Sequence, residues 1–99
     1  MSTQIGYVTR DEMNAAIALQ AQLPPGVTVF ATDSEDNLPP VPLSAIVYDL
    51  DHMWDDENRR VVQRLSNERP AVPTVVHSYK IGEGLAEQFR IAGVKAYRV

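Results

Sequence analysis

The chain contains no cysteine, which excludes disulfide bridges, thiolate metal sites and thiol nucleophiles. It has only two histidines, His52 and His77, so a histidine-based metal site would also need carboxylate ligands. No apolar run approaches the roughly 20 residues that cross a bilayer, and the N-terminus lacks the basic start and apolar core of a signal peptide. The formal net charge of -4 disfavours binding to nucleic-acid backbones. We therefore expect a soluble cytoplasmic domain that binds neither membranes nor nucleic acid.

What the sequence does contain is an alternation of short β-rich runs with amphipathic helical stretches. With 99 residues the chain is predicted to form a single domain, 1–99. The predicted strands are 5–8, 27–31, 45–48, 73–76 and 94–99. The predicted helices begin at Thr9, Asp55 and Glu83. This alternation predicts an α/β domain built from βαβ units with right-handed crossovers.

Local signals mark where the predicted helices begin and end. Thr9 and Glu12 have the spacing of a capping box, and Pro24-Pro25-Gly26 ends the helix that they open. Asp55-Asp56-Glu57 is expected to cap the second helix and to place acids at the positive end of its dipole. Gly93 is the expected C-terminal stop of the third helix.

One connection breaks the alternation. Residues 32–43 contain three prolines and a run of polar side chains, which makes a regular helix improbable between the second and third strands. We expect an extended loop with at most one short turn. The third strand, Ala45–Tyr48, is an uninterrupted apolar run, which is typical of an interior strand of a parallel sheet covered on both faces.

Three segments carry a resemblance to a known family. They are AIVYDLDHM at 45–53, PTVVHSY at 73–79 and AGVKAYRV at 92–99. Together, in this order and spacing, they resemble the strand ends of response-regulator receiver (CheY-like) domains, in a degenerate or pseudo-receiver form. The resemblance implies a flavodoxin-like five-stranded parallel sheet, ordered 2-1-3-4-5, with helices on both faces. The second helix of the family would be replaced by the loop, and the last helix would be absent.

The resemblance also implies roles for individual residues. Asp49 would occupy the phosphoacceptor position, and Ser78 and Tyr97 would occupy the two switch positions. The pocket around Asp49 would include Thr9, Arg10, Asp11 and Asp51. Receivers hold magnesium with two acids just after the first strand, where this chain has Thr9 and Arg10. We therefore expect no cofactor or metal, with magnesium required only if Asp49 is phosphorylated.

Three interpretations of Asp49 and Asp51 remain open at this point. They could form a residual phosphorylation site, pair with Arg10 in place of magnesium, or be solvated loop acids. We favour the Arg10 pairing, because Arg10 follows the adjacent strand of the expected sheet.

A parallel sheet that lacks part of its helical cover exposes apolar area that monomers rarely tolerate. The leading prediction is therefore a non-catalytic signalling or regulatory module, not an enzyme, whose bare sheet face is covered by a protein partner or by a second copy in a homodimer. The alternative is a phosphoacceptor receiver that uses Asp49. A third option is a small aspartate-based phosphotransfer enzyme, because 47–51 also resembles the first motif of haloacid-dehalogenase-type phosphatases. That motif requires a later lysine and acidic pair that this sequence does not supply.

Overall fold

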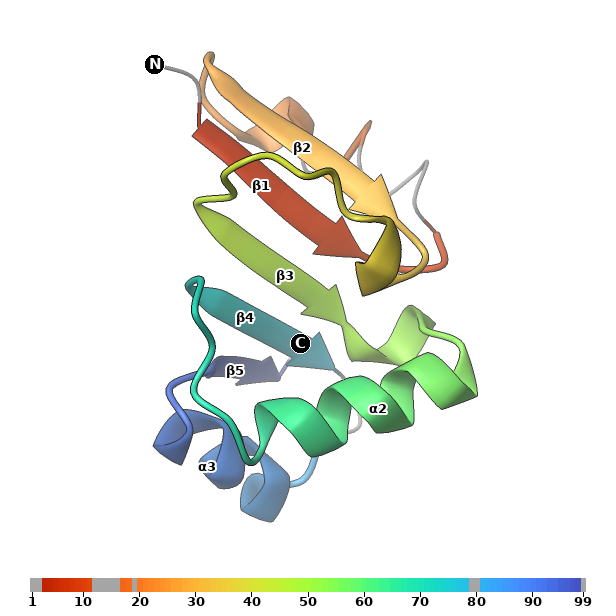
Figure 1. Cartoon of the computed structure of the whole chain (residues 1–99), viewed down its shortest axis with the longest axis vertical. Helices are drawn as coiled ribbons and strands as arrows, with labels where there is room; N and C mark the ends of the chain where they lie inside the picture. The colour runs from red at the N-terminus through yellow and green to blue at the C-terminus, as the bar shows by residue number, and fades with distance from the viewer. Residues whose placement is uncertain (1–2, 12–16, 19, 79–80, 99) are drawn as a thin grey trace.

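The computed structural model describes residues 3–11, 17–18, 20–78 and 81–98, with only the backbone at 97 and 98. Five parallel strands form one sheet in the order β2-β1-β3-β4-β5 (Figure 1). The strands are β1 (Thr3–Val8), β2 (Val27–Thr32), β3 (Ala45–Asp49), β4 (Thr74–Ser78) and β5 (Lys95–Arg98). This arrangement confirms the predicted flavodoxin-like α/β fold and its strand order.

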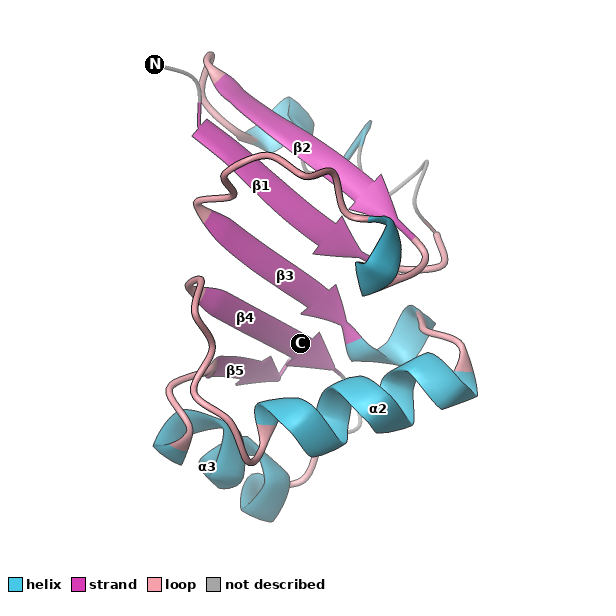
Figure 2. Ribbon diagram, in the orientation of Figure 1, coloured by secondary structure: helices cyan, strands magenta, loops and turns pink. Residues whose placement is uncertain are grey.

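Two α-helices and two short 3-10 turns connect the strands (Figure 2). They are η1 (Glu35–Asn37), η2 (Leu50–His52), α2 (Asp55–Leu65) and α3 (Glu83–Ile91). Residues 17–18 and 20–22 are also helical, where the first helix is expected. The rest of that stretch, residues 12–16 and 19, lies outside the described part of the chain. Within that described part, no helix has the length and apolar character needed to cross a membrane.

Helix α2 begins at Asp55, as the sequence predicts, but a different residue occupies its N-cap. Val61 and Leu65 are buried, and Asp55, Asp56 and Glu57 lie in the first turn. The expected cap at Asp55 is wrong, however, because the N-cap residue is Trp54, which makes no side-chain capping hydrogen bond. The three acids of the first turn still interact favourably with the helix dipole, although no side chain caps the helix.

Helix α3 ends as the sequence predicts. The C-cap is Ala92, and Gly93 follows it with a φ of +93°, a conformation that favours glycine. The N–H of Val94 donates to the carbonyl of Phe89 at 2.8 Å, which closes the helix end. This tight stop turns the chain directly into β5.

The hydrophobic core lies between one face of the sheet and the helices α2 and α3. Core side chains come mainly from the second half of the chain. The buried members are Val8, Tyr48, Leu50, Met53, Val61, Leu65, Val76, Ile81, Ala86, Phe89, Val94 and Ala96.

The loop between β2 and β3, which contains η1, covers part of the same face, over β1. Its Leu38 packs so close to Gly6 that a Cβ at Gly6 would lie 2.8 Å from a terminal methyl of Leu38. Glu35 in η1 accepts hydrogen bonds from the Tyr48 hydroxyl at 2.9 Å and from the guanidinium of Arg64 on α2. The predicted loop with one short turn is thus confirmed, and polar contacts to β3 and α2 fix it in place.

The opposite face of the sheet is much less covered. Along β4, residues alternate between buried and half-buried, with Val75 and His77 half-buried. Parallel register brings side chains of neighbouring strands to this same side, and we call this set the open face: Ile5, Tyr7, Ala45, Val47, Val75 and His77. On this side the helical residues Ile17, Gln20 and Ala21 line a hollow together with Val29 of the edge strand β2.

Candidate functional site

Asp49 lies at the carboxyl end of β3, at the edge of the sheet where α/β proteins commonly bind ligands. Only 7 % of its surface is exposed. The hydroxyl of the fully buried Thr9 donates to Asp49 Oδ2 at 3.2 Å. The same Thr9 oxygen accepts from the backbone N–H of Asp11 at 3.2 Å, which is the N-cap part of the predicted capping box. Thr9 therefore links the backbone of the segment after β1 to the Asp49 carboxylate, whereas Glu12 of the predicted capping box lies outside the described residues.

Two histidines approach the Asp49 carboxylate from different elements. His52 Nδ1 lies 2.9 Å from Oδ2, and the side chain of His52 is half exposed. His77, the register neighbour of Asp49 on β4, has its Nδ1 3.9 Å from Oδ1. This geometry suits an Nδ1–H on His52 that donates to the carboxylate and leaves Nε2 available to solvent.

Tyr7 extends this cluster across the sheet to β1. Its hydroxyl lies 2.8 Å from Nε2 of His77, and the two rings meet edge to face with centroids 5.9 Å apart. Burial, followed by the negative charge of Asp49, raises the pKa of Tyr7 to about 12. Tyr7 therefore stays protonated near neutral pH and can donate a hydrogen bond to His77. The result is a cluster on the open-face side of the sheet edge, in which Tyr7 hydrogen-bonds to His77, His52 hydrogen-bonds to Asp49, and His77 lies 3.9 Å from Asp49.

The favoured contact between Arg10 and Asp49 is wrong. The Arg10 guanidinium lies over the ring of Trp54, 4.7 Å from its centroid, and the Arg10 backbone N–H donates to the carbonyl of His52 at 2.6 Å. A cation over an exposed indole keeps its solvation, whereas the buried carboxylate is already satisfied by Thr9 and His52.

Ser78 belongs to a different group of side chains. It follows His77 on β4 and therefore faces the opposite side of the sheet, where it is buried and donates to Asp51 Oδ1 at 2.6 Å. Asp51 and Asp49 thus have separate partners, although they are only two residues apart. Tyr97 is the register neighbour of His77 on β5, but its side chain lies outside the described part of the chain.

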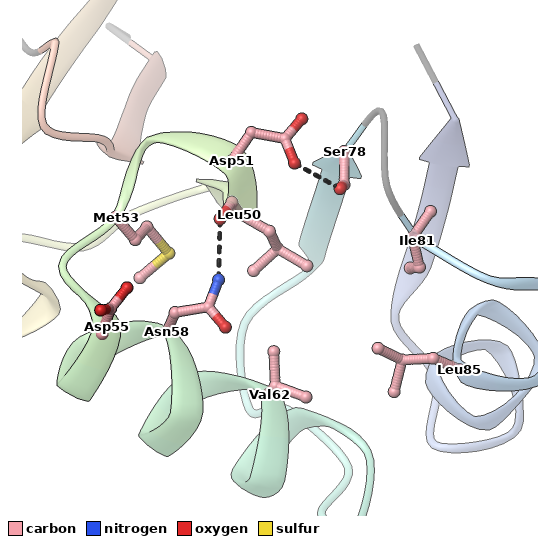
Figure 3. Close-up of a pocket in the computed structure, with 9 residues that line it drawn as sticks. All are labelled: Leu50, Asp51, Met53, Asp55, Asn58, Val62, Ser78, Ile81 and Leu85. Atoms are coloured by element: carbon pink, nitrogen blue, oxygen red, sulfur yellow. Dashed lines mark hydrogen bonds between the residues drawn. The ribbon is translucent and has the colours of Figure 1, made fainter.

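Next to the Ser78–Asp51 pair is a pocket of about 360 Å³ between the ends of β3 and β4 and the helices α2 and α3 (Figure 3). Its walls are about equally polar and apolar, and Asn58 on one side donates to the carbonyl of Leu50 at 2.7 Å. The lining residues are Leu50, Asp51, Met53, Asp55, Asn58, Val62, Ser78, Ile81 and Leu85. Its size is at the lower end of the range for small-molecule pockets.

Across the described residues, no group of three or more histidine and acidic side chains is placed to hold an ion. Thr9 and Arg10 follow β1 where acids would be needed, and Thr9 donates to the carboxylate as a neutral hydroxyl. The Asp49–His52 pair has the arrangement of a carboxylate-oriented base, but no hydroxyl or thiol nucleophile of the described chain contacts His52.

Sequence reasoning placed Thr9 and Asp49 in one site but missed the partners of Asp49. His52 is three residues after Asp49, a spacing that a short 3-10 turn brings into contact. His77 is the direct cross-strand neighbour of Asp49, which the predicted strand register could have shown. Tyr7 follows from the same register reasoning on β1.

No protein-family model matches the chain, and no curated protein or solved structure matches it either.

Proposed function

We propose that this chain is a non-catalytic, receiver-like module that acts in cytoplasmic signalling or regulation by binding protein through its open face. The proposed occupant of that face is a second copy of the chain. The observation that carries this proposal is the alternating burial along β4, an interior strand of a parallel sheet. Such strands are normally covered on both sides, so half-buried Val47 and Val75 at the middle of the sheet indicate a surface that needs a partner.

The charge on the open face favours a second copy. The chain has a net charge of -4, so two copies repel each other over most of their surfaces. The open face contributes apolar and neutral side chains, the exposed Lys95 of β5 lies beside Val75 at its border, and the nearest acid, Asp49, is buried and hydrogen-bonded at its rim. Burial of this face would therefore remove apolar area from water.

The surroundings of Asp49 support a non-catalytic role over phosphorylation. An aspartate that accepts a phosphoryl group needs free carboxylate oxygens and a bound cation. Asp49 Oδ2 instead accepts from Thr9 and contacts His52, and the guanidinium of Arg10 lies on Trp54. This carboxylate is better suited to hold the strand ends together than to attack a phosphoryl group.

Sedimentation velocity at micromolar concentration tests the self-association. We expect the wild-type chain to sediment as a dimer and Val47→Lys to raise the dissociation constant at least tenfold, about 1.4 kcal/mol, because it places a charge in the centre of the interface. Ile91→Lys is the matched control, since Ile91 is 74 % exposed on α3, away from the open face. A monomeric wild type, or equal effects of the two variants, would contradict the proposed interface.

A separate titration tests the non-catalytic role. Beryllofluoride with magnesium, followed by NMR, is expected to leave the backbone amide signals of Asp49 and Ser78 unchanged. Saturable shifts at both residues would favour the phosphoacceptor function instead.

A further inference from the structure

The pocket beside the Ser78–Asp51 pair receives two polar side chains from the start of α2. Asp55 and Asn58 are three residues apart on this helix, so they are neighbours on its surface, and both line the pocket (Figure 3). The Asp55 carboxylate makes no hydrogen bond or ion pair with any other residue that the structure describes. Two of the lining residues are acidic and none of them is basic, so the pocket carries negative charge.

The lining side chains offer mainly hydrogen-bond acceptors. Asn58 Nδ2 donates to the carbonyl of Leu50 at 2.7 Å, and the Ser78 hydroxyl donates to Asp51 Oδ1 at 2.6 Å. The bond to a carbonyl oxygen identifies the nitrogen end of the Asn58 amide, so Oδ1 is the end that points toward the pocket (Figure 3). The second N–H of Asn58 is then the one other side-chain donor among the lining residues, and a single neutral N–H cannot balance the charge of a phosphate or a carboxylate.

The other wall of the pocket is apolar. The side chains of Leu50, Val62 and Leu85 point toward one another across it (Figure 3). Val62 and Leu85 are only partly buried and pack against the core. An apolar ligand group placed between them would therefore remove exposed apolar surface from water.

We propose that this pocket binds a small molecule that carries a primary ammonium group on an apolar body, such as an arylalkylamine. The ammonium group would donate to the Asp55 carboxylate and to Asn58 Oδ1, and the apolar body would lie against Leu50, Val62 and Leu85. An ammonium group has three N–H donors and no acceptor, so it complements a wall of acceptors better than an alcohol or a carboxylate does.

The volume and the lining exclude other occupants. A volume of about 360 Å³ suits a small molecule. A bare metal ion fits less well, because no three acidic or histidine side chains of the described residues converge and the apolar wall cannot replace the ion's water ligands. Ser78 and the pocket lie on the side of the sheet opposite the open face, so this site is independent of the proposed self-association.

Phenethylamine is the probe, and it is cationic near neutral pH. It is titrated into the full chain while the backbone amide signals are followed by NMR. We expect saturable shifts at Leu50, Asn58 and Leu85, with a dissociation constant of about 1 mM or lower. Asp55→Asn keeps the shape of the side chain but removes its charge, so it should bind the amine at least about fivefold more weakly. Asp56→Asn is the matched control, because it makes the same charge change in the same turn of α2 but does not line the pocket, and it should bind within about twofold of wild type.

Three analogues separate the contributions of charge and apolar contact. Phenethyl alcohol lacks the charge and methylamine lacks the apolar body, so each should bind wild type at least about tenfold more weakly than phenethylamine. Phenylpropanoate, which carries the opposite charge, should give no saturable shift. No saturation by phenethylamine below about 10 mM, equal effects of Asp55→Asn and Asp56→Asn, or binding of any analogue as tight as that of the amine would overturn the proposal.

Discussion

Tyr48 gives a quantitative test of the contacts that hold the loop over the sheet. Its side chain is 3 % exposed, and its hydroxyl donates to Glu35 at 2.9 Å and accepts from Arg64 at 3.2 Å. Burial is the main cause that raises the pKa of Tyr48 from 10.0 to about 12, and the charge of Glu35 adds to it while the hydrogen bond from Arg64 lowers it.

The effect of pH on the free energy of unfolding has a definite sign, because the folded chain keeps the Tyr48 proton to a higher pH than the unfolded chain does. Above pH 10 the unfolded chain loses the Tyr48 proton, whereas the folded chain keeps it until about pH 12. Unfolding therefore becomes easier across this window, by about 1.4 kcal/mol per pH unit, or about 2–3 kcal/mol in total. Tyr48→Phe has no proton to lose, but near pH 8 it lacks the hydrogen bond to Glu35 and should be about 1 kcal/mol less stable than wild type.

The expected result is a reversal of the stability order. Urea unfolding followed by far-ultraviolet circular dichroism, at several pH values from 8 to about 11.5, should show wild type as the more stable protein at the low end and Tyr48→Phe at the high end. Every other ionisable group is common to both proteins, so its contribution cancels in the difference. A constant difference between the two proteins across this range would refute the assignment of a raised pKa to Tyr48.

Two further predictions concern stability and use the same urea assay. Glu35→Ala removes the shared acceptor of Tyr48 and Arg64 and should lower the free energy of unfolding by about 2 kcal/mol. Asp36→Ala breaks only an exposed contact to Arg60 and should lower it by under about 0.5 kcal/mol. Similar losses for both variants would contradict a central role of Glu35. Gly93→Ala should destabilise the chain by about 1–2 kcal/mol because the φ at this position is +93°. Gly84→Ala, inside α3 with open space around its Cα, should instead stabilise it by about 0.5–1 kcal/mol, and the same sign for both glycines would refute this backbone argument.

The strand order of the fold could be predicted because short-range signals agree with each other along most of the chain. The apolar runs at β1, β3 and β4, the prolines of 39–42 and Gly93 each restrict the backbone locally, and right-handed crossovers leave few ways to connect such elements. The start of α2 at Asp55 was predicted correctly, but its cap was not, because Trp54 takes the N-cap position although three acids that suit a cap follow it.

The contacts of the site were harder to predict because they depend on where long side chains find partners. Sequence position places Arg10 near Asp49, but a guanidinium can reach several neighbours, and here it lies over Trp54. The short side chain of Thr9 has little freedom, so its contact with Asp49 follows almost directly from strand register. To predict that His52 and His77 lie near Asp49, one needs both the 3-10 turn after β3 and the pairing of β3 with β4.

The uneven position of the hydrophobic core has a consequence for how the domain assembles. Among the residues that the structure describes, nearly all buried apolar side chains come from β3 onward, and Val8 is the one fully buried core member that precedes it. The segment from β3 to β5 with α2 and α3 can therefore condense as a cooperative unit of its own, with mostly short loops to close. β1 and β2 then add to an existing template through backbone pairing, Thr9 and the loop contacts of Glu35. β1 and β2 are thus the strands that open first and close last.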